Sequence, residues 1–495
     1  MVCDANGEVY RLKKRSLLHV SIALGFVGVI SFVLAGCGKT FYFAGRTLPP
    51  SQLTNRVMVA IQSPGIAASG ELQIIDGFYD IRHSSNNAIP NFFVNGFAGK
   101  QPITIENLPE EQTGAVYSSG DGTVAQVDYA TEKQTTTIPG LVGPSSSVFV
   151  SRNLNYIVAA NQNVHILTMV DRTLGNSVGK GVYYMNLPGV YRVSINPGAS
   201  VALAFIQDTN DVYSVVHLTA DQQVAASTSP DPQHFQPTGA PVAAQDCEPQ
   251  NLPQYCAFKV QTPAGVSFDR PVKAIFSADG TSAFVLNCGP ECGGQQAGFT
   301  VVPITAASLN GSTAAGPSAL ALVPAKTIPI PGGASNAIQN GNTLYFAGQQ
   351  VQADGFYSGN LTTFDLPSQA VTGTYPIADG NPRKMGFADD STLWVGSSLC
   401  QQGERYHLNP NSTSGCLTMF NISKNSIFID AYKGDATGIA PVIGLHKIYS
   451  AEGGQIYIYN TTDGSDRDNS NVTVVGTATD VSYMDGNSDG QNTTY

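Results

Sequence analysis

Few residues in this sequence have types and spacings that could carry out a reaction. The chain contains no His-Glu-x-x-His and no Gly-x-Gly-x-x-Gly, the spacings by which zinc proteases and dinucleotide-binding proteins hold a metal or cofactor. The histidines beyond residue 40 occur singly, and a lone histidine is more often a strand or loop residue than a ligand: His83, His165, His217, His234, His407 and His446. Spacing therefore identifies no reaction, although side chains far apart in the sequence could still meet in the folded chain.

One acidic pattern near the C-terminus is typical of the start of a calcium-binding loop. Asp485, Asn487 and Asp489 occupy alternate positions before Gly490, as the first ligands of such a loop do. The bidentate glutamate of the loop does not follow. We therefore expect these three residues to bind calcium weakly if at all, with a flexible tail over 487–495 as the favoured alternative. No other cofactor is expected.

Six cysteines beyond residue 40 could form disulfides or bind a metal. They fall into three local pairs, Cys247 with Cys256, Cys288 with Cys292, and Cys400 with Cys416. The sequence does not prove the connectivity, but the local grouping favours these three disulfides in an exported chain. A thiolate zinc site is the alternative, and it is disfavoured because Cys288-x-x-x-Cys292 has no second ligand pair nearby.

A repeated pair of short strands must position these residues. In the clearest unit, 272–287, two apolar runs flank a turn that contains Asp279 and Gly280. Asp-Gly in this context predicts a hairpin, because glycine tolerates the positive φ of a tight turn. Eight units of this kind place a second strand at 57–61, 115–118, 156–160, 201–206, 283–287, 344–347, 393–395 and 447–450. A third strand follows at 72–75, 124–129, 164–170, 212–218, 299–304, 361–366, 417–422 and 456–459.

Repeats at spacings of ~40–60 residues are typical of β-propellers. We therefore predict an all-β fold over residues 56–486, a single propeller of four-stranded antiparallel blades, with eight blades preferred and seven possible. Two β-sandwiches are the alternative. The first unit lacks an innermost strand, so 480–484 is expected to complete it, after an outermost strand at 472–475. We expect 221–263 to be an irregular insertion, and we expect no amphipathic helix in the mature chain.

The unit from Phe276 to Asn287, FSADGTSAFVLN, resembles the propeller repeat named for the tetrapeptide Tyr-Val-Thr-Asn. That repeat occurs in lactonase-like propellers and in many bacterial surface proteins. Only this unit matches it well, and the other units keep the strands and turns without the residues. The resemblance implies a propeller, and it keeps an enzyme resembling lactonases or quinoproteins, with a site in the central channel, as an alternative function.

The first 36 residues have the features of a secretory signal, expected to form an N-terminal signal helix. Basic residues precede an uncharged apolar stretch at 17–35, and Leu34-Ala35-Gly36-Cys37 resembles the lipobox of bacterial lipoproteins. The resemblance implies cleavage before Cys37, lipidation of that cysteine, and a tether over 37–55. Gly38 in place of aspartate favours the outer membrane. A retained transmembrane helix is the alternative, because the apolar stretch is long enough to span a bilayer.

Composition restricts the partners. The net charge of −11 gives no basic footprint for the phosphate backbone of a nucleic acid, so nucleic acid is not expected as a partner. Long loops after three neighbouring second strands are expected on one face, and Phe356 and Tyr357 are candidates for contact there. We predict a lipid-anchored propeller in the bacterial envelope that binds an unknown protein or small ligand, or acts as a scaffold. A structural subunit of an envelope assembly is a further alternative.

Overall fold

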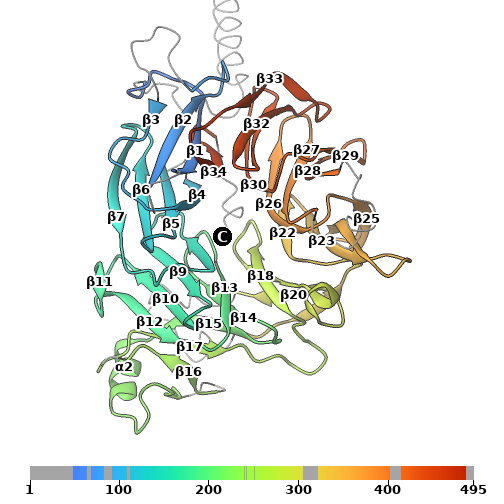
Figure 1. The fold of residues 1–495 in the computed structure, drawn as a ribbon. Coiled ribbons are helices and arrows are strands. Elements are labelled where there is room, and N and C mark those ends of the chain that lie inside the picture. The colour runs from blue at the N-terminus through green and yellow to red at the C-terminus, as the bar shows by residue number, and fades with distance from the viewer. Residues whose placement is uncertain are drawn as a thin grey trace, which may run out of the picture. The chain divides into compact units, whose positions relative to one another are not determined.

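The computed structural model describes residues 48–63, 69–82, 92–108, 112–238, 240, 242–249, 251–304, 322–401 and 414–486. Within these residues the strands form eight antiparallel sheets, to one of which a short parallel edge strand is added, and the sheets follow one another around a central axis (Figure 1). The predicted all-β propeller is confirmed, with eight blades. The predicted signal at 1–36 and the tether before residue 48 lie outside the described residues.

Each of the first four blades extends from an inner strand at the axis to an outer edge strand. From the axis outward, blade 1 contains β34 (Thr477–Tyr483), β1 (Arg56–Gln62), β2 (Gly70–Asp76) and β3 (Phe92–Phe93). Blade 2 contains β4 (Pro102–Leu108), β5 (Thr113–Ser118), β6 (Thr123–Asp128) and β7 (Lys133–Ile138). Blade 3 contains β8 (Ser147–Val150), β9 (Tyr156–Asn161), β10 (Ile166–Asp171), β12 (Gly181–Asn186) and β11 (Ser177–Val178). Blade 4 contains β13 (Val190–Ile195), β14 (Ala202–Ile206), β15 (Val212–His217), β17 (Tyr255–Lys259) and β16 (Ala244–Cys247).

The other four blades have four strands each among the described residues. Blade 5 contains β18 (Pro271–Phe276), β19 (Ser282–Asn287), β20 (Gly298–Pro303) and β21 (Lys326–Pro329). Blade 6 contains β22 (Asn336–Asn340), β23 (Thr343–Val351), β24 (Tyr357–Asp365) and β25 (Ala370–Pro376). Blade 7 contains β26 (Asn381–Ala388), β27 (Thr392–Ser398), β28 (Ser414–Asn421) and β29 (Ser426–Ala431). Blade 8 contains β30 (Ala436–Val442), β31 (Lys447–Glu452), β32 (Gln455–Asn460) and β33 (Asp466–Val472).

The predicted hairpin of blade 5 forms as its turn chemistry requires. Gly280 has a φ of 70°, and its N–H donates to the carbonyl of Ser277 at 2.8 Å. Asp279 accepts from the Thr281 N–H at 3.1 Å and from the Ser277 hydroxyl at 2.6 Å. The turn thus satisfies its own polar groups and sets the register in which Phe276 faces Ala283.

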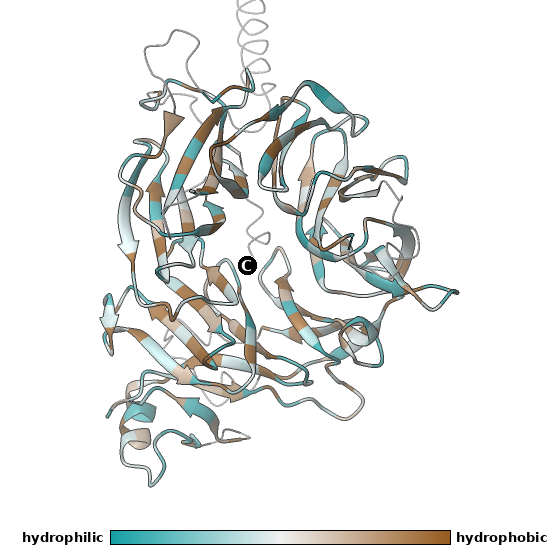
Figure 2. Cartoon of the chain, viewed as in Figure 1, coloured by the Kyte–Doolittle hydropathy of each residue, from teal (hydrophilic) through white to brown (hydrophobic). Residues whose placement is uncertain are grey.

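Each pair of neighbouring blades buries its own apolar cluster. In β1, Val57, Val59 and Ile61 pack against blade 8, whereas Met58 and Ala60 pack against blade 2. Alternate residues of a strand point to opposite faces of its sheet, so a strand covered on both faces is apolar at every position. This explains why the second and third strands are recognisable as apolar runs, and Figure 2 shows brown residues along these strands and teal at many turns and outer edges.

The C-terminal strand closes the ring. β34 pairs antiparallel with β1, with Tyr483 opposite Val57, and so provides the innermost strand of blade 1. This confirms the closure predicted for 480–484. Arg56, which is fully buried, fastens the junction, since its Nη2 lies 2.7 Å from Oδ1 of Asp485 and its Nη1 lies 3.0 Å from Oε1 of Glu132 in blade 2.

Two predicted segments differ from the structure. The outermost strand of blade 8 is Asp466–Val472 and not 472–475, because an outermost strand faces solvent and carries no apolar run. The insertion at 221–263 is not irregular, since it contains most of helix α2 (Ala220–Ser227) and two strands of blade 4. Thr219 caps α2 through a hydrogen bond from the Gln222 N–H, and the helix packs through Ala226 alone, so this short helix has no amphipathic pattern by which the sequence could predict it.

Figure 1 shows α2 and β16 at the outer edge of blade 4. Because neighbouring strands are antiparallel, the insertion leaves the blade on the face opposite to the loops that follow second strands. We call the latter face the loop-bearing face. Among the described residues, no helix combines the length and apolar character needed to cross a bilayer.

Candidate binding site at the mouth of the channel

An irregularity recurs near the start of most inner strands. The pairing with the second strand skips one residue, so that the register passes from Pro102 to Thr104, Val190 to Arg192, Pro271 to Lys273, Pro382 to Lys384 and Ala436 to Gly438. In β34 the same break lies between Ala478 and Asp480. A bulge re-aims the side chains beside it. Six inner strands therefore present the residue after the bulge at an equivalent level around the axis.

A chain of polar contacts links the inner strands of blades 5, 6 and 7. The Lys273 side chain is buried, and its Nζ donates to Oδ1 of Asn336 at 2.8 Å. The amide of Asn336 in turn donates to the carbonyl of Arg383 at 2.9 Å. These contacts fix Lys273 and the backbone at Arg383 relative to each other, although the two residues are more than one hundred positions apart.

A second set of contacts links blades 7, 1 and 2. Lys384 Nζ lies 2.8 Å from Asp480 Oδ2, and both side chains are buried. The same carboxylate oxygen accepts from the backbone N–H of Ile105 at 2.8 Å and from the Thr104 hydroxyl at 3.1 Å. Near the bulges the inner wall therefore carries polar side chains that bond from one blade to another.

A cavity of about 270 Å³ opens where these inner strands begin, on the loop-bearing face, and we call it the mouth cavity. Residues from five neighbouring blades line it: Ser146, Gln162, Tyr191, Arg192, Val272, Lys273, Glu291, Cys292, Ser335, Asn336, Asn381, Pro382 and Arg383. Three of these side chains are basic, and Glu291 is the one carboxyl group among them. The cavity combines convergent polar groups with a pre-formed wall, as ligand sites do.

Glu291 lies in a short 3₁₀ turn, η2 (Gly289–Cys292), that the Cys288–Cys292 disulfide spans. Its Oε2 accepts the backbone N–H of Gln349 from blade 6 at 3.0 Å. Burial raises the pKa of the Glu291 carboxyl to about 7, against the opposing effects of the Gln349 N–H and of the Arg192 charge. This group therefore changes its charge near neutral pH.

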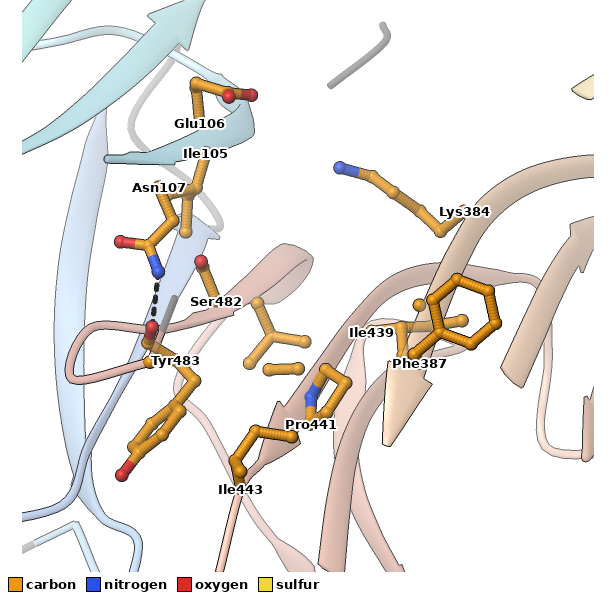
Figure 3. Close-up of a pocket in the computed structure, with 14 residues that line it drawn as sticks. Ile105, Glu106, Asn107, Lys384, Phe387, Ile439, Pro441, Ile443, Ser482 and Tyr483 are labelled. Atoms are coloured by element: carbon orange, nitrogen blue, oxygen red, sulfur yellow. Dashed lines mark hydrogen bonds between the residues drawn. The ribbon is translucent and has the colours of Figure 1, made fainter. Parts of the chain in front are cut away.

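Two further cavities lie along the axis and share Lys384 in their linings. One, of about 370 Å³, opens on the loop-bearing face and includes Arg383 and Asp435. The other, of about 210 Å³, is lined by the later residues of inner strands. Figure 3 shows Lys384 extending from one wall of this second cavity toward the wall that carries Ile105 and Glu106, with Phe387 and Pro441 below. Lys384 thus lies between the two spaces.

The cysteines pair as predicted. Disulfides join Cys247 to Cys256, Cys288 to Cys292 and Cys400 to Cys416. The first links β16 to β17, the second spans η2, and the third closes the loop between β27 and β28, of which residues 402–413 lie outside the described part. Two of the three disulfides therefore hold loops on the loop-bearing face.

Phe356 and Tyr357 follow the turn between β23 and β24. Both are half-buried, and the Tyr357 hydroxyl donates to the carbonyl of Pro290 in η2 at 2.9 Å. Tyr357 thus braces the disulfide-held turn of blade 5 against blade 6. Neither aromatic residue lines the mouth cavity.

The other predicted site residues are dispersed. Both carboxylate oxygens of Asp485 bond to Arg56, while Asn487, Asp489 and Cys37 lie outside the described residues, so the calcium site and the lipidation stay predictions. Within the described residues no cluster of three or more His, Cys, Asp or Glu side chains suits a metal. Of the histidines that the structure describes, none lines any of the three cavities, and His83 and His407 lie outside.

A Gly-x-Ser-x-Gly sequence at Gly175 to Gly179 has the spacing of a hydrolase nucleophile turn. Its Ser177 lies in the exposed edge strand β11 and not in a strand-to-helix turn, which such a nucleophile requires. The match is therefore a coincidence of spacing.

The basic residues of the mouth cavity were not singled out from the sequence. A pattern that could have found one of them, Lys273, is a proline two residues before a lysine; it occurs in Pro271-x-Lys273 and again in Pro382-x-Lys384, whose lysine lines the two other cavities. Both prolines lie at the inner-strand bulge, where a residue without an N–H is tolerated. Arg192 and Glu291 carry no comparable pattern.

Comparisons with known proteins add little beyond the fold. No family model and no curated protein matches this sequence. Solved structures that resemble it include the dihydro-heme d1 dehydrogenase NirN in complex with DHE, with 12% identity and a TM-score of 0.48 over 88% of this chain and 78% of that chain. Hydrazine synthase of Kuenenia stuttgartiensis has 12% identity and a TM-score of 0.45 over 74% of this chain and 99% of that chain. These likenesses are too distant to support any inference about ligand or activity.

Proposed function

We propose that this protein is an exported, lipid-anchored β-propeller of the bacterial envelope that acts as a binding module, with its ligand site in the mouth cavity. The observation that carries this proposal is the convergence of side chains from five blades on one pre-formed cavity. A site assembled from rigid inner strands needs little ordering when a ligand binds, which favours affinity.

The rim of the cavity supports the same function. Glu291 and Cys292 belong to the disulfide-held turn, and contacts from Gln349 and Tyr357 of blade 6 restrain that turn. Restraint of this kind reduces the entropy that a loop loses when it closes on a ligand. The disulfide-held turn is therefore suited to binding a ligand at the rim of the cavity.

Export is supported by the three disulfides, which form and persist in oxidising compartments. Together with the lipobox resemblance at Cys37, they favour anchoring outside the cytoplasm. Replacement of Cys37 by serine should abolish incorporation of labelled fatty acid into the protein in its host, whereas Cys3→Ser should leave the label in place. Equal labelling of both variants would contradict lipidation at Cys37.

Ligand binding can be tested before the ligand is known. We expect a thermal-shift screen of sugars, amino acids, carboxylates and phosphates to yield a compound that raises the melting temperature and binds in calorimetry. The variant Ser335→Phe should abolish this binding by filling the cavity, whatever the chemistry of the ligand. Gly198→Ala, in a turn with open space around its backbone, is the control and should bind normally. Binding that survives Ser335→Phe, or a screen without any binder, would contradict the site.

An enzyme is the second candidate, and Glu291 is the observation that favours it. A carboxyl group whose pKa is raised to about 7 by burial is suited to proton transfer, and Arg192 beside it could stabilise negative charge. Binding is preferred because the lining contains no second carboxyl or imidazole to complete an acid–base pair. Turnover of any bound compound that Glu291→Gln abolishes without loss of binding would favour the enzyme.

A further inference from the structure

Resting on the proposed function, we infer that the ligand of the mouth cavity is a small anion that carries carboxylate or phosphate groups, recognised by Arg192, Lys273 and Arg383 from three different blades. The three side chains line one cavity, although the chain as a whole carries 25 basic and 36 acidic residues. A local excess of positive charge in an acidic protein concentrates anions at that point.

The strands hold each basic group in place. Lys273 is 3% exposed, and its bond to Asn336 directs the ammonium group along the inner wall. Arg383 lines both the mouth cavity and the cavity of about 370 Å³, and its Nε donates at 2.9 Å to the hydroxyl of Ser398 in the latter, which restricts the plane of its guanidinium. Arg192 lies with its guanidinium carbon 5.5 Å from the centre of the Tyr191 ring. Guanidinium groups fixed in this way can form paired, charge-assisted hydrogen bonds with carboxylate or phosphate oxygens.

The rest of the lining fits the same ligand class. The Ser146 and Ser335 hydroxyls donate to backbone carbonyls, so their oxygens can accept hydrogen bonds from hydroxyl groups of the ligand. At about 270 Å³ the cavity is slightly smaller than sites for drug-sized molecules, so the ligand is small. A long polyanion is disfavoured, because the net charge of −11 would repel whatever extended beyond the cavity.

Glu291 makes the site dependent on pH. The charge of Arg192 acts on it, and Tyr191, Lys273 and Arg383 are the other titratable groups of the lining. When the Glu291 carboxyl is protonated, the cavity loses its one negative charge, so anions bind more tightly as pH falls through about 7. In Glu291→Gln the part of this dependence that comes from the protein should disappear, leaving only the part that comes from ionisation of the anion, while the anions still bind.

Calorimetry with citrate, inorganic phosphate and glucose tests the inference, with the purified protein at low salt. We expect citrate or phosphate to bind and glucose to fail, with affinity falling roughly 10- to 100-fold in Arg192→Gln or Arg383→Gln. Arg467→Gln, which removes the same charge from the outermost strand of blade 8, is the matched control and should leave binding unchanged.

Three results would overturn it. Equal weakening by Arg467→Gln would mean that the anions respond to overall charge and not to the cavity. Binding of glucose that Ser335→Phe blocks and Arg192→Gln leaves intact would reject the anion class while keeping the proposed binding site. Failure of every compound, in this experiment and in the wider screen, would reject the proposed function itself.

Discussion

Lys384 of blade 7 and Asp480 of blade 1 form a buried ion pair, 2.8 Å from Nζ to Oδ2, that passes across the inner strand of blade 8. Gly438 occupies the equivalent position of that intervening strand, and its Cα hydrogen leaves room for the Asp480 carboxylate. Because Asp480 also accepts from Thr104 and Ile105 of blade 2, one carboxylate joins three inner strands near the point of ring closure.

Removal of either member of this pair should destabilise the fold. Asp480→Asn leaves a buried ammonium without its counter-charge and should cost about 3–5 kcal/mol, as should Lys384→Met. The double variant should lose less free energy of unfolding than the two single variants lose together. A double-mutant cycle measured by urea unfolding should give a coupling energy of about 1 kcal/mol or more. The exposed pair Lys259–Asp211, at 2.6 Å, is the control and should couple by less than about 1 kcal/mol. Equal coupling energies in the Lys384–Asp480 and Lys259–Asp211 cycles would contradict a stabilising role for the buried pair.

Gly438 should tolerate no side chain. A Cβ at this position would lie 2.6 Å from both Asp480 Oδ1 and the Val481 nitrogen. Gly438→Ala should therefore lower the free energy of unfolding by about 1–3 kcal/mol. Gly198→Ala, whose Cβ would meet nothing closer than 3.9 Å, should change it by less than about 0.5 kcal/mol. Comparable losses in the two variants would indicate a general effect of alanine and not a clash.

The C-terminal strand should be essential for a closed ring. A chain that stops at Thr477 lacks nearly all of β34 and the Asp485 partner of Arg56, so β1 becomes an exposed edge. We expect its melting temperature to fall by on the order of 10 °C, or the unfolding transition to lose its cooperativity. A chain that stops at Gly486 keeps both features and should melt like the full protein. A scanning calorimeter distinguishes these outcomes, and equal melting of all three chains would contradict closure by β34.

Much of the fold could be predicted from the sequence because of how blades are buried. The second and third strands have neighbours on both faces, so β1 and β19 are apolar runs with clear turns between them. The missing inner strand of the first unit then predicted the pairing at 480–484. Outermost strands could not be predicted in this way, since they lack an apolar pattern. β33, for example, is polar along most of its length and is defined only by its hydrogen bonds.

The site could not be predicted in the same way. Arg192, Lys273 and Arg383 are separated by tens to more than a hundred residues, and only the ring geometry brings their strands together. The sequence has a proline two residues before Lys273 and two residues before Lys384. This spacing marks an inner-strand bulge, which only the strand pairing of the folded chain reveals. Phe356 and Tyr357 were predicted as contact residues because they lie in a long loop. In the structure the Tyr357 hydroxyl instead bonds to the neighbouring turn of blade 5.

A buried glutamate between blades 7 and 8 should make stability depend on pH. Glu452 is 1% exposed, and the Tyr459 hydroxyl donates to its Oε1 at 2.7 Å. Burial raises the pKa of Glu452 from 4.5 to about 7 in the folded state, although Tyr459 and the charge of Lys433 oppose the shift. A raised carboxyl pKa gives stability that is fully present below the unfolded value and is lost as pH rises through about 7.

Glu452→Gln should therefore stabilise the protein at about pH 8 by roughly 1–3 kcal/mol, because the glutamine keeps an acceptor for Tyr459 without a buried charge, and the gain should shrink at about pH 6. Urea unfolding of both proteins at the two pH values measures this difference. Asp463→Asn serves as the control, since hydrogen bonds from Ser465 lower the pKa of the exposed Asp463 carboxyl, which stays ionised across this range. If Glu452→Gln changed stability equally at both pH values, ionisation of Glu452 would not be the cause.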